Sequence, residues 1–141
     1  MSPGSAAARA PGLLQPQAWL LAGWVALVLS ASLYPFEWDW ARLAEALRAG
    51  LPRLSEWVPP SRRDSIVNLL LYVPCGLLGA LALDAGAPAL KRLAWPILGA
   101  AALSLCVELA QHALPPRDPS LADWVFNIVS ATIGTLLAVA Y

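Results

Sequence analysis

The chain has 141 residues, of which 59% are hydrophobic and 13% are charged, and its mean hydropathy is +0.62. This balance lies outside the range of ordinary soluble domains and predicts a membrane protein. Nine basic and nine acidic residues give no net charge. Because the basic residues are scattered and form no stripe, no nucleic-acid partner is expected.

The first 17 residues are rich in alanine, proline and glycine, and we expect a flexible tail there, followed by a membrane domain over residues 18–141. The first apolar run covers residues 18–34. It is just long enough to cross a hydrocarbon core, which takes about 20 residues. A cleaved signal peptide is the alternative, since Arg9 precedes the apolar run and small serines lie near its end.

Residues 40–57 follow a different pattern, with apolar residues at steps of three and four and charged residues opposite them. The apolar positions are Trp40, Leu43, Leu47, Leu51 and Leu54. This pattern predicts a short amphipathic helix on the membrane surface, ending near Gly50 and Pro52. A solvated loop is the alternative, and Pro59 and Pro60 favour it for the second half.

Three further apolar runs, which lack lysine and arginine, cover about residues 66–83, 93–114 and 121–141. Short connectors make neighbouring spans antiparallel. The predicted fold is all-α, a four-helix transmembrane bundle with a short amphipathic interfacial helix between the first and second spans. Basic residues are more numerous on the side where the second span begins, but the first span usually dominates, so both orientations stay open.

Polar residues gather at one end of this bundle. The second and fourth spans each open with the pattern Asp-x-x-x-Asn, which places both side chains on one helix face. This echo indicates either a parallel internal repeat or chance. The third span ends on the same side and contributes further polar residues. The candidate polar pocket comprises Asp64, Asn68, Glu108, Gln111, His112, Arg117, Asp123 and Asn127.

Glu108 lies inside the third span, where a carboxylate costs about 2.5 to 3.5 kcal/mol at the bilayer centre. We expect Arg117 to pair with it, because a guanidinium can hold a carboxylate with two hydrogen bonds. The polar group would then be either a ligand pocket or a set of contacts that hold the helices together. His112 is the only histidine and matches no metal-binding spacing, so neither a metal nor a cofactor is expected.

Three segments resemble the VanZ-like family. Residues 108–127 read ELAQHALPPRDPSLADWVFN, with Glu, then Gln three residues on, a proline-arginine turn, and Asp-x-x-x-Asn. Residues 64–76 are similar to the second-helix pattern of the family, and residues 32–36 to its exit from the first helix. The resemblance implies a multi-pass protein of a bacterial plasma or inner membrane, whose namesake is linked to resistance to the glycopeptide antibiotic teicoplanin.

Three functions are compatible with this sequence. In the first, the pocket binds an envelope lipid head group, a cell-wall precursor or an amphiphilic drug. In the second, the protein is a membrane enzyme for a lipid-linked substrate, with Glu108 or Asp123 as base and Arg117 on a phosphate. In the third, it is a helical partner in a homo-oligomer or larger membrane complex, assembled through Gly76, Gly79 or Gly134.

Overall fold

The computed structural model describes residues 16–51, 57, 59 and 61–141. Within them it has no strands, and its helices are α1 (Pro16–Leu33), α2 (Trp40–Arg48), α4 (Arg62–Leu81), α5 (Ala89–Gln111) and α6 (Leu121–Ala140). Four of these helices, all except α2, are long and apolar enough to cross a membrane. The predicted all-α fold and its four spans are confirmed. The expected tail lies almost wholly outside the described residues, as do Pro52 and Leu54.

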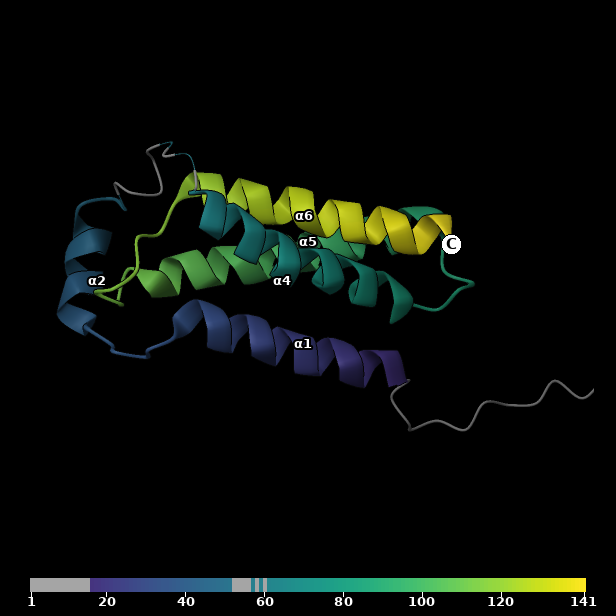
Figure 1. Ribbon diagram of the computed structural model, residues 1–141, viewed down its shortest axis with the longest axis horizontal. Helices are drawn as coiled ribbons and strands as arrows, with labels where there is room; N and C mark the ends of the chain where they lie inside the picture. Colours follow the sequence, from purple (N-terminus) through teal and green to yellow (C-terminus); the bar gives the residue numbers. More distant parts are fainter. Residues whose placement is uncertain (1–15, 52–56, 58, 60) are drawn as a thin grey trace, which may run out of the picture.

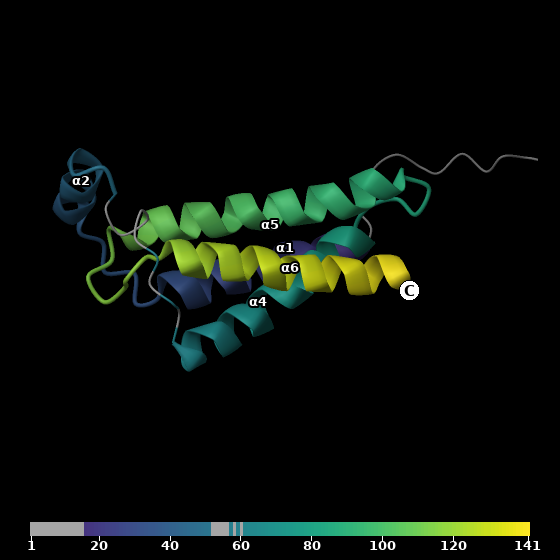
Figure 2. The ribbon, with the colours of Figure 1, turned by 90° about the horizontal axis from the view of Figure 1, so that it is seen from above.

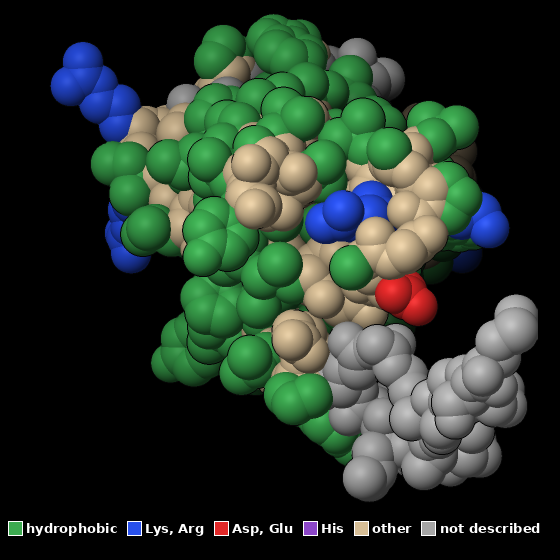
Figure 3. All heavy atoms as spheres, turned by 90° about the vertical axis from the view of Figure 1, so that its right-hand side faces the viewer, with side chains coloured by type: hydrophobic (Ala, Val, Ile, Leu, Met, Phe, Trp, Pro, Cys, Tyr) green, Lys and Arg blue, Asp and Glu red, His purple; other side chains and the backbone are tan. Residues whose placement is uncertain are grey.

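The four long helices lie side by side, and α2 lies across one end of them (Figure 1). Large apolar side chains cover the outside of the bundle, among them Leu70, Leu98 and Leu137. In water such a surface would drive aggregation, but in lipid it is the expected exterior. The opposite end of the bundle is also mostly hydrophobic, with few charged groups (Figure 3).

Local side chains fix where the helices begin. The helix α4 starts at Arg62, before the predicted residue 66, because the Ser61 hydroxyl accepts a hydrogen bond from the Asp64 amide at 3.2 Å. The helix α6 starts at the predicted position, where the Ser120 hydroxyl accepts from the Ala122 amide. A serine therefore caps the N-terminal end of each of the two parallel helices, α4 and α6.

The parallel helices α4 and α6 make the closest contact in the bundle and cross obliquely (Figure 2). A Cβ atom added to Gly76 would overlap the carbonyl group of Ala131, and one added to Gly134 would overlap that of Val73. Small residues allow helices to approach this closely in membranes. The two glycines therefore serve packing within the chain, and they do not form an exposed surface for a partner helix.

The helix α2 is held to the bundle by its polar face. Asp39 caps its first turn by accepting from the Arg42 amide at 3.1 Å, and the Arg42 guanidinium donates to the Leu114 carbonyl at 2.8 Å. No residue of α2 is buried, and Trp40 and Leu47 are exposed. An apolar face without a protein partner, at the end of a transmembrane bundle, is what an interfacial helix presents to lipid. The predicted interfacial helix is confirmed.

Candidate functional site

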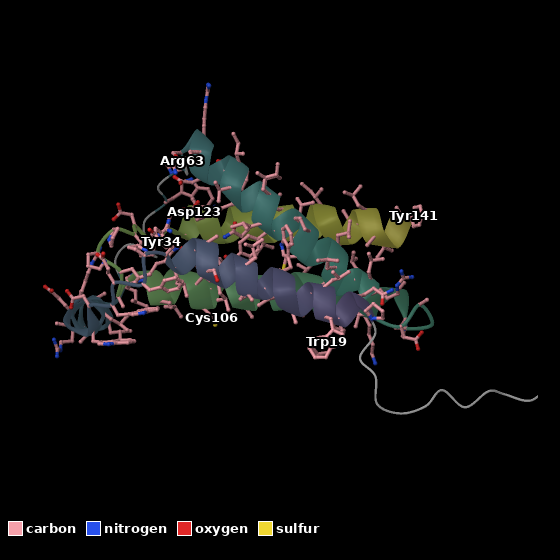
Figure 4. All side chains as sticks on the ribbon, turned by 60° about the horizontal axis from the view of Figure 1, so that its bottom comes forward. Trp19, Tyr34, Arg63, Cys106, Asp123 and Tyr141 are labelled. Atoms are coloured by element: carbon pink, nitrogen blue, oxygen red, sulfur yellow. The ribbon has the colours of Figure 1, made fainter. Side chains whose placement is uncertain are left out.

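A cavity of about 450 Å³ lies at the end of the bundle where α4 and α6 begin and α1 and α5 end. Tyr34, Arg63 and Asp123, from three different segments, lie at this end, whereas Trp19 and Tyr141 lie at the other (Figure 4). Seven of the eight predicted site residues line the cavity: Asp64, Asn68, Glu108, Gln111, Arg117, Asp123 and Asn127.

His112 does not line the cavity. It follows the last residue of α5 and is buried, with Nδ1 lying 2.9 Å from the carbonyl oxygen of Glu108. Since a carbonyl oxygen can only accept, Nδ1 carries the proton, and the buried Nε2 has no partner among the described residues. The ring therefore folds back on its own helix end instead of turning towards the cavity with Glu108 and Gln111.

The two Asp-x-x-x-Asn segments meet directly. Asn68 on α4 donates from Nδ2 to Oδ1 of Asp123 on α6, at 2.9 Å. The Asp64 carboxylate lies at the exposed start of α4 and accepts from the Ser61 hydroxyl at 2.6 Å. The first turn of each helix thus places a carboxylate, Asp64 or Asp123, in the cavity wall. The Asn68 amide joins the two helices.

Glu108 lies at the floor of the cavity and is 4% exposed. Its Oε2 accepts a hydrogen bond from the backbone amide of Ser120 at 2.8 Å. This hydrogen bond fixes the start of α6 against the end of α5. Glu108 therefore both lines the cavity and holds α5 to the start of α6.

Arg117 does not pair with Glu108, contrary to the expectation from sequence. Its Nε and Nη2 donate to the Tyr34 carbonyl at 3.0 and 2.7 Å, and Nη2 also donates to the Ala31 carbonyl at 2.9 Å. The last carbonyls of a helix have no partners within it and attract a cation. Arg117 therefore closes the end of α1, and its charge is directed to backbone oxygens.

Asn127 occupies a second buried position in the floor. Its Nδ2 donates to the Ser104 hydroxyl at 2.9 Å, which joins α6 to α5. Its Oδ1 is buried and has no hydrogen-bond partner among the described residues. Leaving a buried acceptor without a donor costs about 1 to 3 kcal/mol. This oxygen is therefore free to accept a hydrogen bond from a bound molecule.

Some cavity residues were missed from sequence. Gln111 was predicted and donates to the Ser32 carbonyl at 3.0 Å, but Ser32 itself was not assigned to the site. Val67 and Leu71 form an apolar part of the wall. They lie three and seven residues after Asp64, so helical spacing from that carboxylate could have identified them.

The cavity carries more acidic than basic side chains. Four carboxylates and two guanidinium groups line it. Asp123 lies close enough to both Asp64 and Glu108 for like charges to repel one another. Within the described residues, no three histidine, cysteine, aspartate or glutamate side chains are placed to hold a metal ion. The site is therefore an acidic cavity with no preformed metal cluster in the part described.

The cavity residues all lie in the part of the chain that matches one known protein family. The model of the family described as VanZ/LLP1 matches residues 16–141, a range that contains every described helix and all cavity-lining residues. Neither a curated protein nor a solved structure matches the chain at a significant level.

Proposed function

Because the chain belongs to the VanZ/LLP1 family and is a multi-pass membrane protein, we propose that it binds the head group of an amphiphile at one face of a bacterial cell membrane. The single observation that carries this proposal is the polar cavity at the end of four apolar helices. The classes of amphiphile are an envelope lipid, a lipid-linked cell-wall precursor, or an amphiphilic drug such as teicoplanin.

The shape and lining of the cavity suit a molecule that is half polar and half apolar. Its volume lies within the range of about 300 to 1,000 Å³ that is usual for small-molecule sites. Glu108 and Asn127 provide buried polar contacts at the floor. Val67, at the wall, is 42% exposed, so it offers an apolar surface that a hydrocarbon chain can contact.

Binding is better supported than catalysis. The enzymatic hypothesis needs Arg117 to hold a phosphate, but its Nε and Nη2 already donate to the carbonyls at the end of α1. It also uses Glu108 or Asp123 as a base, but Glu108 accepts from the Ser120 amide and Asp123 accepts from the Asn68 amide. Each of these groups therefore already holds two parts of the chain together.

The proposal can be tested by photo-crosslinking in native membranes. A lipid analogue that carries a photoreactive group on its head should label the peptides that contain Ser32, Val67 and Val107, which line the cavity. Val67→Trp should abolish this labelling because the larger ring occupies the cavity. Ile66→Trp is the matched control, since Ile66 is 58% exposed and does not line the cavity.

Two results would count against the proposal. Labelling that is unchanged by Val67→Trp, or that is equal along the outer surface of the four helices, would reduce the contact to ordinary lipid solvation. A deletion strain complemented with wild type, Val67→Trp or Ile66→Trp then tests the role in resistance. Greater sensitivity to teicoplanin in the deletion strain and with Val67→Trp, but not with Ile66→Trp, would show that the cavity is needed for resistance.

A further inference from the structure

The geometry points to a head group that carries a primary ammonium, and we propose that the cavity selects amphiphiles with this group. The inference rests on the proposed function and adds the chemical class of the ligand. The ammonium would lie against Asp123, on the wall that Asp64 and Glu108 also line, with one of its N–H groups donating to Oδ1 of Asn127.

The first support is the unsatisfied acceptor. Asn127 lines the cavity and is 2% exposed, yet its Oδ1 has no donor among the described residues. Its amide is held by Ser104, so this oxygen is fixed in position. A ligand that donates a hydrogen bond would satisfy the oxygen, whereas a group with only acceptor atoms, such as a phosphodiester or a sulfate ester, would leave it unpaired.

The second support is the charge of the wall. Asp123 and Glu108 are held by neutral donors, the Asn68 amide and the Ser120 backbone, and neither donor supplies a positive charge. Arg117, which the sequence suggested as the neutralising cation, donates to the carbonyls of Ala31 and Tyr34 instead. Arg63 also lines the cavity, so the wall has one guanidinium without a described partner beside its four carboxylates. A cation from the ligand would further relieve the repulsion between these carboxylates.

The third support is the kind of cation that fits. The described residues contain no cluster of three side chains placed to hold a metal ion. The acceptors line a cavity of about 450 Å³, which has room for a polyatomic head group. An ammonium has three donors on one compact centre, which can reach separate acceptors. A trimethylated ammonium has the charge but no N–H, so it cannot satisfy Asn127.

The test uses the full chain in non-ionic micelles and measures bound lipid by native mass spectrometry. Phosphatidylethanolamine, phosphatidylcholine and phosphatidylglycerol with identical acyl chains compare a primary ammonium, a trimethylated ammonium and no amine. Hexadecylammonium and hexadecyl sulfate repeat the comparison with one chain and no phosphate. We expect about tenfold tighter binding of both primary ammonium compounds, the change expected from about 1.4 kcal/mol of charged hydrogen bonding.

Two carboxamide variants locate the effect. Asp123→Asn and Asp64→Asn should each remove most of the preference for the primary ammonium, because they delete one charge while keeping side-chain size. Glu45→Gln is the control, since it removes one charge from exposed α2 outside the cavity. Asp64 lies at the exposed start of α4, so its variant tests the inference even if Asp123→Asn prevents folding.

The outcomes separate this inference from the proposed function. Phosphatidylglycerol or phosphatidylcholine bound as tightly as phosphatidylethanolamine, with binding still lost in Val67→Trp, would overturn the ammonium preference and leave amphiphile binding intact. Binding of hexadecylammonium without phosphatidylethanolamine would support the preference and assign it to single-chain amphiphiles. Failure of every compound to bind in a Val67→Trp-sensitive manner would overturn both.

Discussion

Asn68 donates a hydrogen bond to Asp123 across the parallel pair α4 and α6, so the amide that ends the first Asp-x-x-x-Asn segment contacts the carboxylate that begins the second. The contact lies beside the cavity, where both residues form part of the wall. It therefore links the stability of the helix pair to the shape of the candidate site.

We predict that Asn68 and Asp123 are energetically coupled. A double-mutant cycle with Asn68→Ala and Asp123→Ala should give a coupling between about 0.6 and 1.7 kcal/mol, the average and the maximum measured for hydrogen bonds between membrane helices. Unfolding in mixed micelles of increasing sodium dodecyl sulfate content measures it. Ser65→Ala is the control partner, because its hydroxyl makes none of the described hydrogen bonds; equal coupling for both pairs would contradict the prediction.

The second prediction concerns the stability of the close contact between α4 and α6. Gly134→Ala should lower the free energy of unfolding by about 3 kcal/mol, at the upper end of typical overpacking costs, because the added Cβ would overlap backbone atoms of Val73, which cannot rotate away as a side chain can. Gly99→Ala is the matched control in α5, where an added Cβ would meet nothing within 4 Å. It should be neutral or stabilising by up to about 1 kcal/mol, since alanine favours helix.

Gly134→Ala and Gly99→Ala also test whether Gly134 takes part in assembly with another chain. If Gly134 instead served an interface with another chain, Gly134→Ala would shift the oligomeric state and leave the unfolding of the monomer unchanged. Sedimentation in detergent together with the unfolding curves decides between these results. A stable Gly134→Ala monomer would show that the contact with Val73 can relax.

Much of the fold was predictable because lipid imposes simple conditions on a chain. A span must satisfy its own backbone hydrogen bonds, so apolar runs of about 20 residues indicate helices. Short connectors then set the direction of each helix, and this placed Asp64 and Asp123 at the same end. The family resemblance drawn from residues 108–127 is confirmed by the matched model, which covers residues 16–141.

The partners of individual side chains were less predictable. Arg117 was assigned to Glu108 because the two are close in sequence, but it donates to Ala31 and Tyr34, more than 80 residues earlier. Glu108 accepts from a backbone amide instead. Because every residue type except proline has such an amide, no sequence pattern identifies this partner. Side-chain contacts of this kind depend on how α1 lies against the other helices.

Arg117 carries the third prediction. Arg117→Gln should loosen the segment after α1, because the carbonyls of Ala31 and Tyr34 lose their charged donor. The loss is about 1 kcal/mol, which corresponds to about fivefold faster amide exchange. Hydrogen exchange measured at Phe36 and Asp39, whose amides donate to backbone carbonyls, reports this opening. Arg63→Gln is the control because Arg63 lines the same cavity without a described hydrogen bond.

The last prediction concerns α2. If its apolar face lies in the membrane interface, a photoreactive reagent confined to lipid should label Trp40 and Leu47, which are 65% and 57% exposed. Glu45, on the opposite side of the helix and also exposed, should remain unlabelled because its charge stays in water. Leu137, a 57% exposed position on a span, is the positive control for contact with lipid. Labelling of Leu137 alone would mean that α2 lies clear of the bilayer and is held only by Arg42 and Asp39. Labelling of Trp40 and Leu47 together with Leu137 would place α2, and the cavity beside it, at the level of the lipid head groups.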